Sequence, residues 1–224
     1  MKTVVVSIGG SVVLSDEADA LFLKKLTALF KKISKENKLF VIVGGGKIAR
    51  RYIQLGRELG FDEDTLDQIG IDVTRVNARI ITNLLGVSNK EIPHTTNDAL
   101  KYDLPIVVMG GTDPRHSTDQ VGAELAEKTN AVRFVNATNV DGIFDKDPNK
   151  FSDAKQIREV TIDHLIAEYG TTWGAAGKNI FMDEPALEII KRAKIPTFIV
   201  NGKRLDQLEK ALLGQPFDGT TILV

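Results

Sequence analysis

Short apolar runs alternate with longer segments of helical period along the chain. The runs are rich in Val and Ile and lack an alternating polar face, which predicts strands that are buried on both faces of a sheet. Six strands are expected, at residues 3–8, 39–43, 104–109, 131–137, 196–200 and 220–224. This order of elements predicts an α/β protein.

Three of the intervening segments place apolar residues at helical spacing. The expected apolar faces are Leu23, Leu26, Phe30 and Ile33 in one helix, Ile69, Val73, Val76, Ile80 and Leu84 in a second, and Leu187 with Ile190 in a third, where Lys191 and Lys194 form the charged side. Strands and helices that alternate are joined by right-handed crossovers, so we expect a mainly parallel sheet covered on both faces. No linker, repeat or low-complexity segment divides residues 1–224, which predicts one domain.

Two stretches interrupt the alternation. Residues 138–160 carry Asp-Gly and Asp-Pro turn signals and predict a turn or hairpin beyond the carboxyl end of a strand. Residues 170–181 are rich in small residues and predict a second irregular segment. Both stretches are long enough to be functional loops rather than simple connections.

Composition narrows the class of protein. Of the 224 residues, 42% are hydrophobic and 26% are charged, with a formal net charge of -1, so neither nucleic acid nor a membrane is expected as the main partner. The absence of cysteine excludes disulfides, thiolate metal sites and a cysteine nucleophile. The first residues contain only a short apolar run, unlike a signal peptide or a membrane span, so we expect a soluble cytoplasmic protein.

Glycine clusters follow three of the predicted strands, and each precedes a predicted helix. They lie at residues 8–12, 43–50 and 109–119. Ligands of open parallel sheets bind beyond the carboxyl ends of the strands, where glycine lets the backbone approach them closely. The helix that follows offers unpaired N–H groups and a partial positive charge to an anion. One such cluster is usually only a turn, but three at one edge of a sheet predict a trough for phosphate groups.

The second cluster is the most informative, because Lys47 and Arg50 are expected in the first turn of the following helix. A cation there opposes the helix dipole by roughly 0.3–1 kcal/mol, and a bound polyphosphate would reverse this penalty. The P-loop motif and the protein-kinase motifs do not occur in the sequence, and no dinucleotide-binding motif is followed by a convincing ribose-binding acid. A phosphotransferase with these glycine clusters would therefore have another architecture.

The motifs "SIGGS", "VGGGK", "GGT" with "STD", "NATNVDGIF" with a later "DP", and the closing "GTTI" occur in order along the whole chain. This ordered set resembles the amino acid kinase family, and within it the archaeal-type uridylate kinases. The resemblance implies a three-layer αβα sandwich that phosphorylates UMP to UDP with ATP and Mg²⁺, in pyrimidine nucleotide synthesis. It also implies a homo-oligomer, a hexamer built from dimers.

The same resemblance assigns residues to the two substrates. On the ATP side it places Gly10, Ser11, Gly46, Arg50, Thr138, Asn139, Phe144 and Asp147. On the UMP side it places Gly45, then Asp67 at the start of a helix, and an acceptor loop of Thr112, Asp113, Pro114, Arg115, His116, Ser117 and Thr118.

One position departs from the family pattern. Many amino acid kinases carry a lysine in the first strand just before the glycine loop, where this chain has Ser7. Lys47 is the candidate that could supply the missing charge. Asp119 is expected to be the N-cap of the helix after the acceptor loop and, by the resemblance, to orient cationic groups around the transferred phosphoryl.

The chemistry expected of these residues is alignment and charge neutralisation. A phosphate acceptor is already ionised, so no strong general base is needed. The three histidines, His94, His116 and His164, are too far apart in sequence to suggest a catalytic triad or a metal site. Mg²⁺ takes much of its coordination from substrate phosphates, so no protein metal ligand is expected. Two alternatives stay open: a kinase for another small acceptor, such as acetylglutamate, aspartate, carbamate or isopentenyl phosphate, and a non-catalytic binder of nucleotides or oxyanions.

Overall fold

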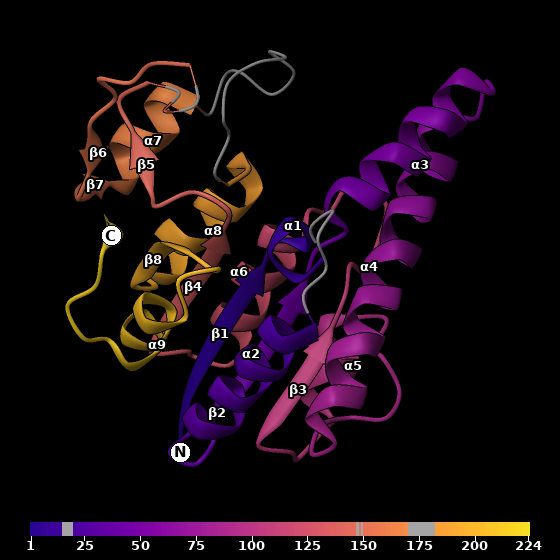
Figure 1. The fold of residues 1–224 in the computed structure, drawn as a ribbon, viewed down its shortest axis with the longest axis horizontal. Helices are drawn as coiled ribbons and strands as arrows, with labels where there is room; N and C mark the ends of the chain where they lie inside the picture. The colour runs from indigo at the N-terminus through magenta and orange to yellow at the C-terminus, as the bar shows by residue number, and fades with distance from the viewer. Residues whose placement is uncertain (15–19, 147, 149, 170–181) are drawn as a thin grey trace.

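A central sheet organises the chain in the computed structural model, which describes residues 1–14, 20–146, 148, 150–169 and 182–224 (Figure 1). Within that part of the chain the sheet has seven strands in the order β3-β2-β1-β4-β8-β9-β7. Their bounds are β1 Lys2–Ile8, β2 Asn37–Val43, β3 Ile106–Met109, β4 Arg133–Thr138, β7 Glu159–Thr161, β8 Thr197–Asn201 and β9 Gly219–Leu223. All six predicted strands are confirmed, and only the short β7 was not predicted.

The sheet is mainly parallel, as expected. The pairs β3–β2, β2–β1, β1–β4, β4–β8 and β9–β7 are parallel, and only β8–β9 is antiparallel. In the registers of β1, Ser7 is opposite Ile42 of β2 and Asn136 of β4. Ser7 therefore lies near the carboxyl end of β1, between two neighbours that end at the same edge.

Helices cover both faces of the sheet, which gives the three layers. The helices α2 Ala20–Ile33, α4 Glu63–Leu85 and α9 Leu205–Leu213 pack on one face, in a core with Val4, Val6 and Val41. The helices α5 Thr96–Leu100, α6 Thr118–Lys128, α7 Ile162–Tyr169 and α8 Glu184–Ala193 pack on the other, in a core with Val5, Phe40 and Phe134. The one-turn α1 Gly10–Val13 follows β1, and α3 Gly46–Glu58 lies along α4 (Figure 1).

Two helix starts differ from the sequence prediction. The side chain of Asp62 caps α4 by accepting a hydrogen bond from the Thr65 N–H at 2.7 Å, so Asp67 lies in the second turn and does not begin the helix. The side chain of Ser117 caps α6 by accepting from the Gln120 N–H at 3.0 Å, so Asp119 lies in the first turn and is not the N-cap. An acidic residue near a helix start is favoured in either position.

The predicted apolar face of α4 is wrong at two of its five positions, while Ile80 packs on the core as expected. Val76 is 61% exposed and Leu84 is 36% exposed, whereas Ala78 and Ile81 are buried against the sheet together with the polar Thr74. The polar residues on the buried side make hydrogen bonds to the glycine loops, described below. These contacts, together with the apolar ones, set the rotation of the helix and leave Val76 and Leu84 facing solvent.

The segment after β4 forms a small separate hairpin. β5 Ile143–Phe144 pairs antiparallel with β6 Gln156–Ile157, which confirms the hairpin expected in residues 138–160. Its strands begin after Asp141 and Gly142, so this Asp-Gly pair precedes the hairpin and does not form its turn. Residues 170–181 lie outside the described residues. In the described parts of the chain, no helix has the length and apolar character needed to cross a bilayer.

Candidate active site

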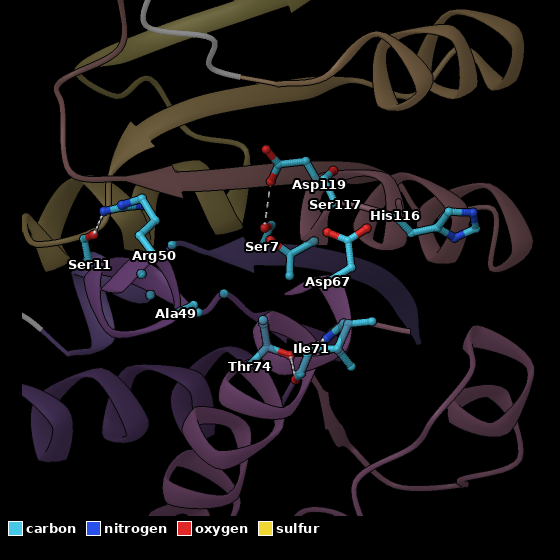
Figure 2. Close-up of a pocket in the computed structure, with 18 of the residues that line it drawn as sticks. Ser7, Ser11, Ala49, Arg50, Asp67, Ile71, Thr74, His116, Ser117 and Asp119 are labelled. Atoms are coloured by element: carbon cyan, nitrogen blue, oxygen red, sulfur yellow. Dashed lines mark hydrogen bonds between the residues drawn. The ribbon is translucent and has the colours of Figure 1, made fainter. Parts of the chain in front are cut away.

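A cavity of about 1040 Å³ opens at the carboxyl edge of the sheet. Its walls come from the loops after β1, β2, β3 and β4, from one side of α4, and from the start of α8. Figure 2 shows Ser7, Asp67, His116 and Asp119 gathered around this space, with Arg50 beside Ser11 at one end. The three glycine clusters therefore do share one site, as the sequence predicted.

The first two glycine loops touch each other through their backbones. A Cβ atom on Gly10 would overlap the backbone of Gly44, Gly45 and Gly46. Gly46 has φ of +67°, in the left-handed region that favours glycine. Side chains at these positions would separate the loops, so the glycines are needed to bring both sets of main-chain amides to one cavity.

Helix α4 holds the second and third glycine loops. Asn77 Nδ2 donates to the Gly44 carbonyl at 2.8 Å. Thr74 Oγ1 accepts from the Gly111 N–H at 2.7 Å and donates to the Ile71 carbonyl at 2.6 Å. Thr74 and Asn77 were missed by sequence reasoning. The signal that could have found them is a pair of polar residues three apart on the helix face that packs under the loops.

Asp67 connects α4 to the loop after β3. Its Oδ2 accepts from the Arg115 N–H at 2.8 Å, and Arg115 has φ of 68°, which is uncommon for a residue with a side chain. The Arg115 guanidinium lies 3.1 Å from Asp64, one turn earlier on the exposed side of the helix. A carboxylate that lines the cavity thus also fixes an unfavourable loop conformation, the combination expected of a site held ready for a ligand.

Asp119 lies at the inner end of the cavity, where the Ser7 hydroxyl donates to its Oδ1 at 2.9 Å (Figure 2). Burial raises the pKa of Asp119 to about 7, although hydrogen bonds from Ser7 and Asn136 favour the ionised form. The side chain is partly accessible from the cavity. Asp183, the N-cap residue of α8, is 5% exposed, and burial likewise raises its pKa. The negative charge of Asp183 adds to the rise at Asp119, so two carboxyl groups share this poorly solvated end.

The cations of α3 are placed differently from one another. Arg50 lines the cavity and donates to Ser11 Oγ at 3.3 Å. It is the fifth residue of α3, just beyond the predicted first turn. Lys47 is in the first turn, is exposed, and does not line the cavity. The structure thus brings one of the two predicted cations to the cavity wall.

Most of the predicted site residues come together here. The cavity is lined by Gly10, Ser11, Gly45, Gly46, Arg50, Asp67, Asp113, Arg115, His116, Ser117, Thr118, Asp119, Thr138 and Asn139. Outside the lining are Lys47, Thr112, Pro114 and Phe144. Asp147 lies outside the described residues. Within the described parts of the chain, no group of three or more histidine, aspartate or glutamate side chains is placed to hold a metal ion.

Comparison with known proteins relates the whole chain to one family. The sequence model of the amino acid kinase family matches residues 2–201. The chain is 43% identical over 223 residues to the uridylate kinase of Methanobrevibacter smithii, with 98% of each chain covered. It is 44% identical over 204 residues to the uridylate kinase of Methanocaldococcus jannaschii, covering 89% of this chain and 90% of that one. The crystal structure of uridylate kinase from Archaeoglobus fulgidus superposes with a TM-score of 0.87 at 38% identity, covering 99% of this chain and 100% of that chain.

Proposed function

Since this chain belongs to the amino acid kinase family, we propose that it is an ATP-dependent kinase that phosphorylates UMP to UDP. The observation that carries the proposal is the cavity, in which three glycine loops and the Asp67 carboxylate face one another. Backbone amides suit phosphate groups, and a carboxylate suits the hydroxyls of a ribose. A substrate with both kinds of group fits this arrangement, and the related uridylate kinases are named for such a substrate.

ATP would occupy the part of the cavity between the first glycine loop and β4. Gly10, Ser11 and Gly46 would present N–H groups to the phosphates, and Arg50 would add a positive charge. Thr138 and Asn139, which line the cavity, would contact the nucleoside together with Phe144, which is outside the lining. Asp147, which is not among the described residues, is assigned to the same nucleoside by the family resemblance. This assignment places the donor phosphates next to Ser7 and Asp119.

UMP would occupy the part of the cavity between α4 and the loop after β3. Gly45 would meet its phosphate, and the Asp67 carboxylate would accept hydrogen bonds from the ribose hydroxyls. The acceptor loop, residues 112–118, would enclose the base; five of its residues line the cavity, and Thr112 and Pro114 would support it from behind. The Asp67–Arg115 hydrogen bond then couples ribose binding to the conformation of that loop.

Catalysis in such a site depends on alignment and charge neutralisation. The attacking oxygen of UMP is already ionised, so no side chain has to remove a proton from it. Arg50 and Lys47 would offset the charge of the phosphates, and Asp119 would orient the groups around the transferred phosphoryl. When bound, Mg²⁺ supplies further neutralisation of the phosphates. The carboxylates here fit a cation held mainly by substrate oxygens, because Asp119 and Asp183 are too few to form a cage by themselves.

We also infer that the protein is a homo-oligomer, expected to be a hexamer, that acts in the cytoplasm in pyrimidine nucleotide synthesis. The support for the oligomer is an apolar stripe made by Ile48, Tyr52 and Leu55 of α3 and by Leu59, the C-cap residue of that helix. These residues are 42–64% exposed, and they recur at helical spacing. Exposed apolar side chains gathered on one side of a helix are typical of a surface that another copy covers.

A coupled phosphotransfer assay tests the proposed function. The purified protein is given ATP and Mg²⁺ with UMP, CMP, acetylglutamate, carbamate or isopentenyl phosphate in parallel. We expect the highest kcat/KM with UMP. A higher value with one of the other acceptors would assign a different kinase activity, and ATP binding without turnover of any acceptor would identify a non-catalytic binder.

A further inference from the structure

The closing motif of the sequence, residues 219–222, and Asp218 just before it make contacts that the proposed function has not used. Thr220 of β9 is fully buried, and its Oγ1 accepts from the Ile143 N–H at 2.9 Å and donates to the Ile157 carbonyl at 2.6 Å. Ile143 and Ile157 belong to the two strands of the small hairpin, β5 and β6. One hydroxyl of the last strand therefore holds both strands of the hairpin.

The loop before that hairpin fits closely against the same hydroxyl. Gly142 has φ of +139°, and a Cβ atom there would lie 2.7 Å from Thr220 Oγ1. Next to it, the Asp141 carbonyl accepts a hydrogen bond from Gln156 Nε2. Thr220 of β9 therefore touches the loop at Gly142 and binds it at Ile143, which links the position of the loop to that of β9.

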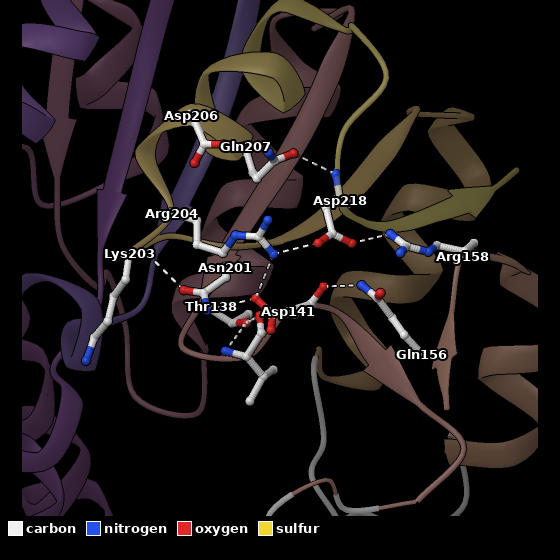
Figure 3. Close-up of polar contacts among 11 residues, drawn as sticks. Thr138, Asp141, Gln156, Arg158, Asn201, Lys203, Arg204, Asp206, Gln207 and Asp218 are labelled. Carbon is white, nitrogen blue, oxygen red and sulfur yellow. Dashed lines mark hydrogen bonds and ion pairs between the residues drawn. The ribbon is translucent and has the colours of Figure 1, made fainter. Parts of the chain in front are cut away.

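A charged cluster fixes the loop from its other side (Figure 3). Asp141 Oδ1 accepts from Asn201 Nδ2 at 3.0 Å and lies 3.4 Å from Arg204 Nη1. Arg204 also pairs with Asp218 at 2.6 Å, and Asp218 pairs on its outer side with Arg158. Asp218 is the residue that precedes β9, so this end of the chain holds the loop both through Thr220 of the closing motif and through the Asp218–Arg204–Asp141 chain.

The loop held in this way begins at the cavity wall. Thr138 and Asn139 line the cavity, and the Thr138 carbonyl accepts from the Gly202 N–H at 2.8 Å. The Thr138 hydroxyl accepts from the Val140 N–H at 3.2 Å, which makes a tight turn between the lining residues and Asp141. A displacement of residues 141–143 would therefore be passed directly to the two residues that meet the cavity.

We propose that Thr220 and the Asp218–Arg204–Asp141 cluster are positioning residues for the donor nucleotide. They hold the loop of residues 138–144 in the conformation that receives the nucleoside of ATP, and they have no contact with UMP. This inference rests on the proposed function, because it takes the loop after β4 as the ATP side of the cavity. It gives the closing motif, which does not line the cavity, a specific part in binding one substrate.

The test measures the ATP dissociation constant by calorimetry, and the KM values for ATP and UMP by coupled assay, on the full-length protein. Thr220→Val removes the hydroxyl at nearly constant volume, and Thr220→Ser restores it. Thr221→Val is the matched control, because Thr221 points from the opposite face of β9. Arg204→Gln tests the charged cluster on the surface, and Arg158→Gln is its control, since it removes only the outer partner of Asp218.

We expect Thr220→Val and Arg204→Gln to weaken ATP binding and raise the KM for ATP by about tenfold, the scale of one lost buried or charged hydrogen bond. The KM for UMP should change by less than about twofold, and the other three variants should resemble the wild type. Equal rises in both KM values, or no change in ATP binding, would overturn the inference. If Thr220→Val does not fold, Arg204→Gln and its control decide by the same criterion.

The wild-type protein separates this inference from the proposed function. Wild-type protein that binds ATP but does not phosphorylate UMP contradicts the proposed function, while the ATP dissociation constants of the variants still decide the role of Thr220. Wild-type protein that does not bind ATP contradicts both.

Discussion

The Ser7 hydroxyl donates a 2.9 Å hydrogen bond to Asp119, from the carboxyl end of β1 to the first turn of α6. A lysine at position 7, as many amino acid kinases have, would neutralise this carboxylate. The hydroxyl of Ser7 stabilises the anion by a single hydrogen bond. The effect of burial is larger than that of this hydrogen bond, since the pKa of Asp119 is raised to about 7. The charge at the inner end of the cavity therefore depends on pH near neutrality.

The stability of the fold should record this ionisation. The folded pKa of about 7 lies above the ordinary 3.8, so the folded state binds the proton more tightly, and stability falls as the pH rises from about 4 to about 7. Asp119→Asn removes the part of that dependence that comes from Asp119, while the part from Asp183 stays. The variant should be more stable than the wild type at pH 8, by about 1–3 kcal/mol because cavity water reduces the full cost of the charge. Urea unfolding of the wild type and of Asp119→Asn at pH 5 and pH 8 measures the difference in their free energies of unfolding. Parallel changes in the two proteins would show that Asp119 is ionised at both pH values.

The strands were predictable from the sequence because each is apolar at nearly every position, whatever its neighbours are. The rotation of α4 was not, because a count of apolar positions favours Val76, while the structure buries Thr74 and Asn77. Those two side chains face inward because they satisfy the backbone of the glycine loops, and that partner is distant in sequence. A hydrophobic pattern cannot anticipate such contacts.

The site was predictable to a similar degree. Glycine clusters after parallel strands must converge on one edge of the sheet, and they do. Which helix residue then faces the cavity depends on how α3 lies on α4, so Arg50 reaches the cavity wall and Lys47 does not line it. The closing motif gave no chemical signal, because Thr220 acts only through contacts with a hairpin about 60–80 residues earlier in the chain.

The contact between the first two glycine loops can be tested by a pair of adjacent substitutions. Gly10→Ala would drive a Cβ into the backbone of Gly44–Gly46, so the loops must separate. Gly9→Ala should be tolerated, because Gly9 has φ of -55° and its added Cβ would lie 3.5 Å from the Ala137 carbonyl oxygen. We expect Gly10→Ala to lower kcat/KM at least about 100-fold and to destabilise the fold by about 1–3 kcal/mol.

Steady-state kinetics measures the loss of kcat/KM in the two glycine variants, and thermal unfolding measures their loss of stability. Near-wild-type activity of Gly10→Ala would mean that the loops can separate without cost to the site. Loss of activity in Gly9→Ala as well would point to a general intolerance of the segment, and not to the specific contact.

Asp67 should act on one substrate only. Asp67→Asn keeps an oxygen that can accept from the Arg115 N–H, but it removes the charge offered to the ribose hydroxyls. We expect the KM for UMP to rise about 10- to 100-fold, the scale of a hydrogen bond to a charged group, and the KM for ATP to change little. Asp64→Asn is the control, because Asp64 also pairs with Arg115 but does not line the cavity. Equal effects on the two KM values would contradict the assignment of Asp67 to UMP.

The two cations of α3 can be ranked in the same assay. Arg50 lines the cavity beside Ser11, so Arg50→Ala should lower kcat/KM about 100-fold, as the removal of a charge from a phosphate site does. Arg51→Ala, which changes an exposed neighbour outside the lining, should have less than about a threefold effect. Lys47→Ala tests whether Lys47 supplies the charge that the family lysine would provide. If the kcat of Lys47→Ala equals that of the wild type, Lys47 does not supply this charge, and Arg50 is the cation of α3 that serves catalysis.

The apolar stripe on α3 should determine the oligomeric state. Leu55→Lys keeps a good helix former but places a charge at the centre of the stripe, where Leu55 is 51% exposed in one chain. If another copy covers this surface, the buried charge would dissociate the assembly, and analytical ultracentrifugation should show a smaller species than the wild type at equal concentration. Val87→Lys is the matched control, since Val87 is 49% exposed but lies beyond the end of α4. Wild-type protein that sediments as a monomer, or identical sedimentation of Leu55→Lys and the wild type, would show that the stripe faces solvent and that its residues are exposed for another reason.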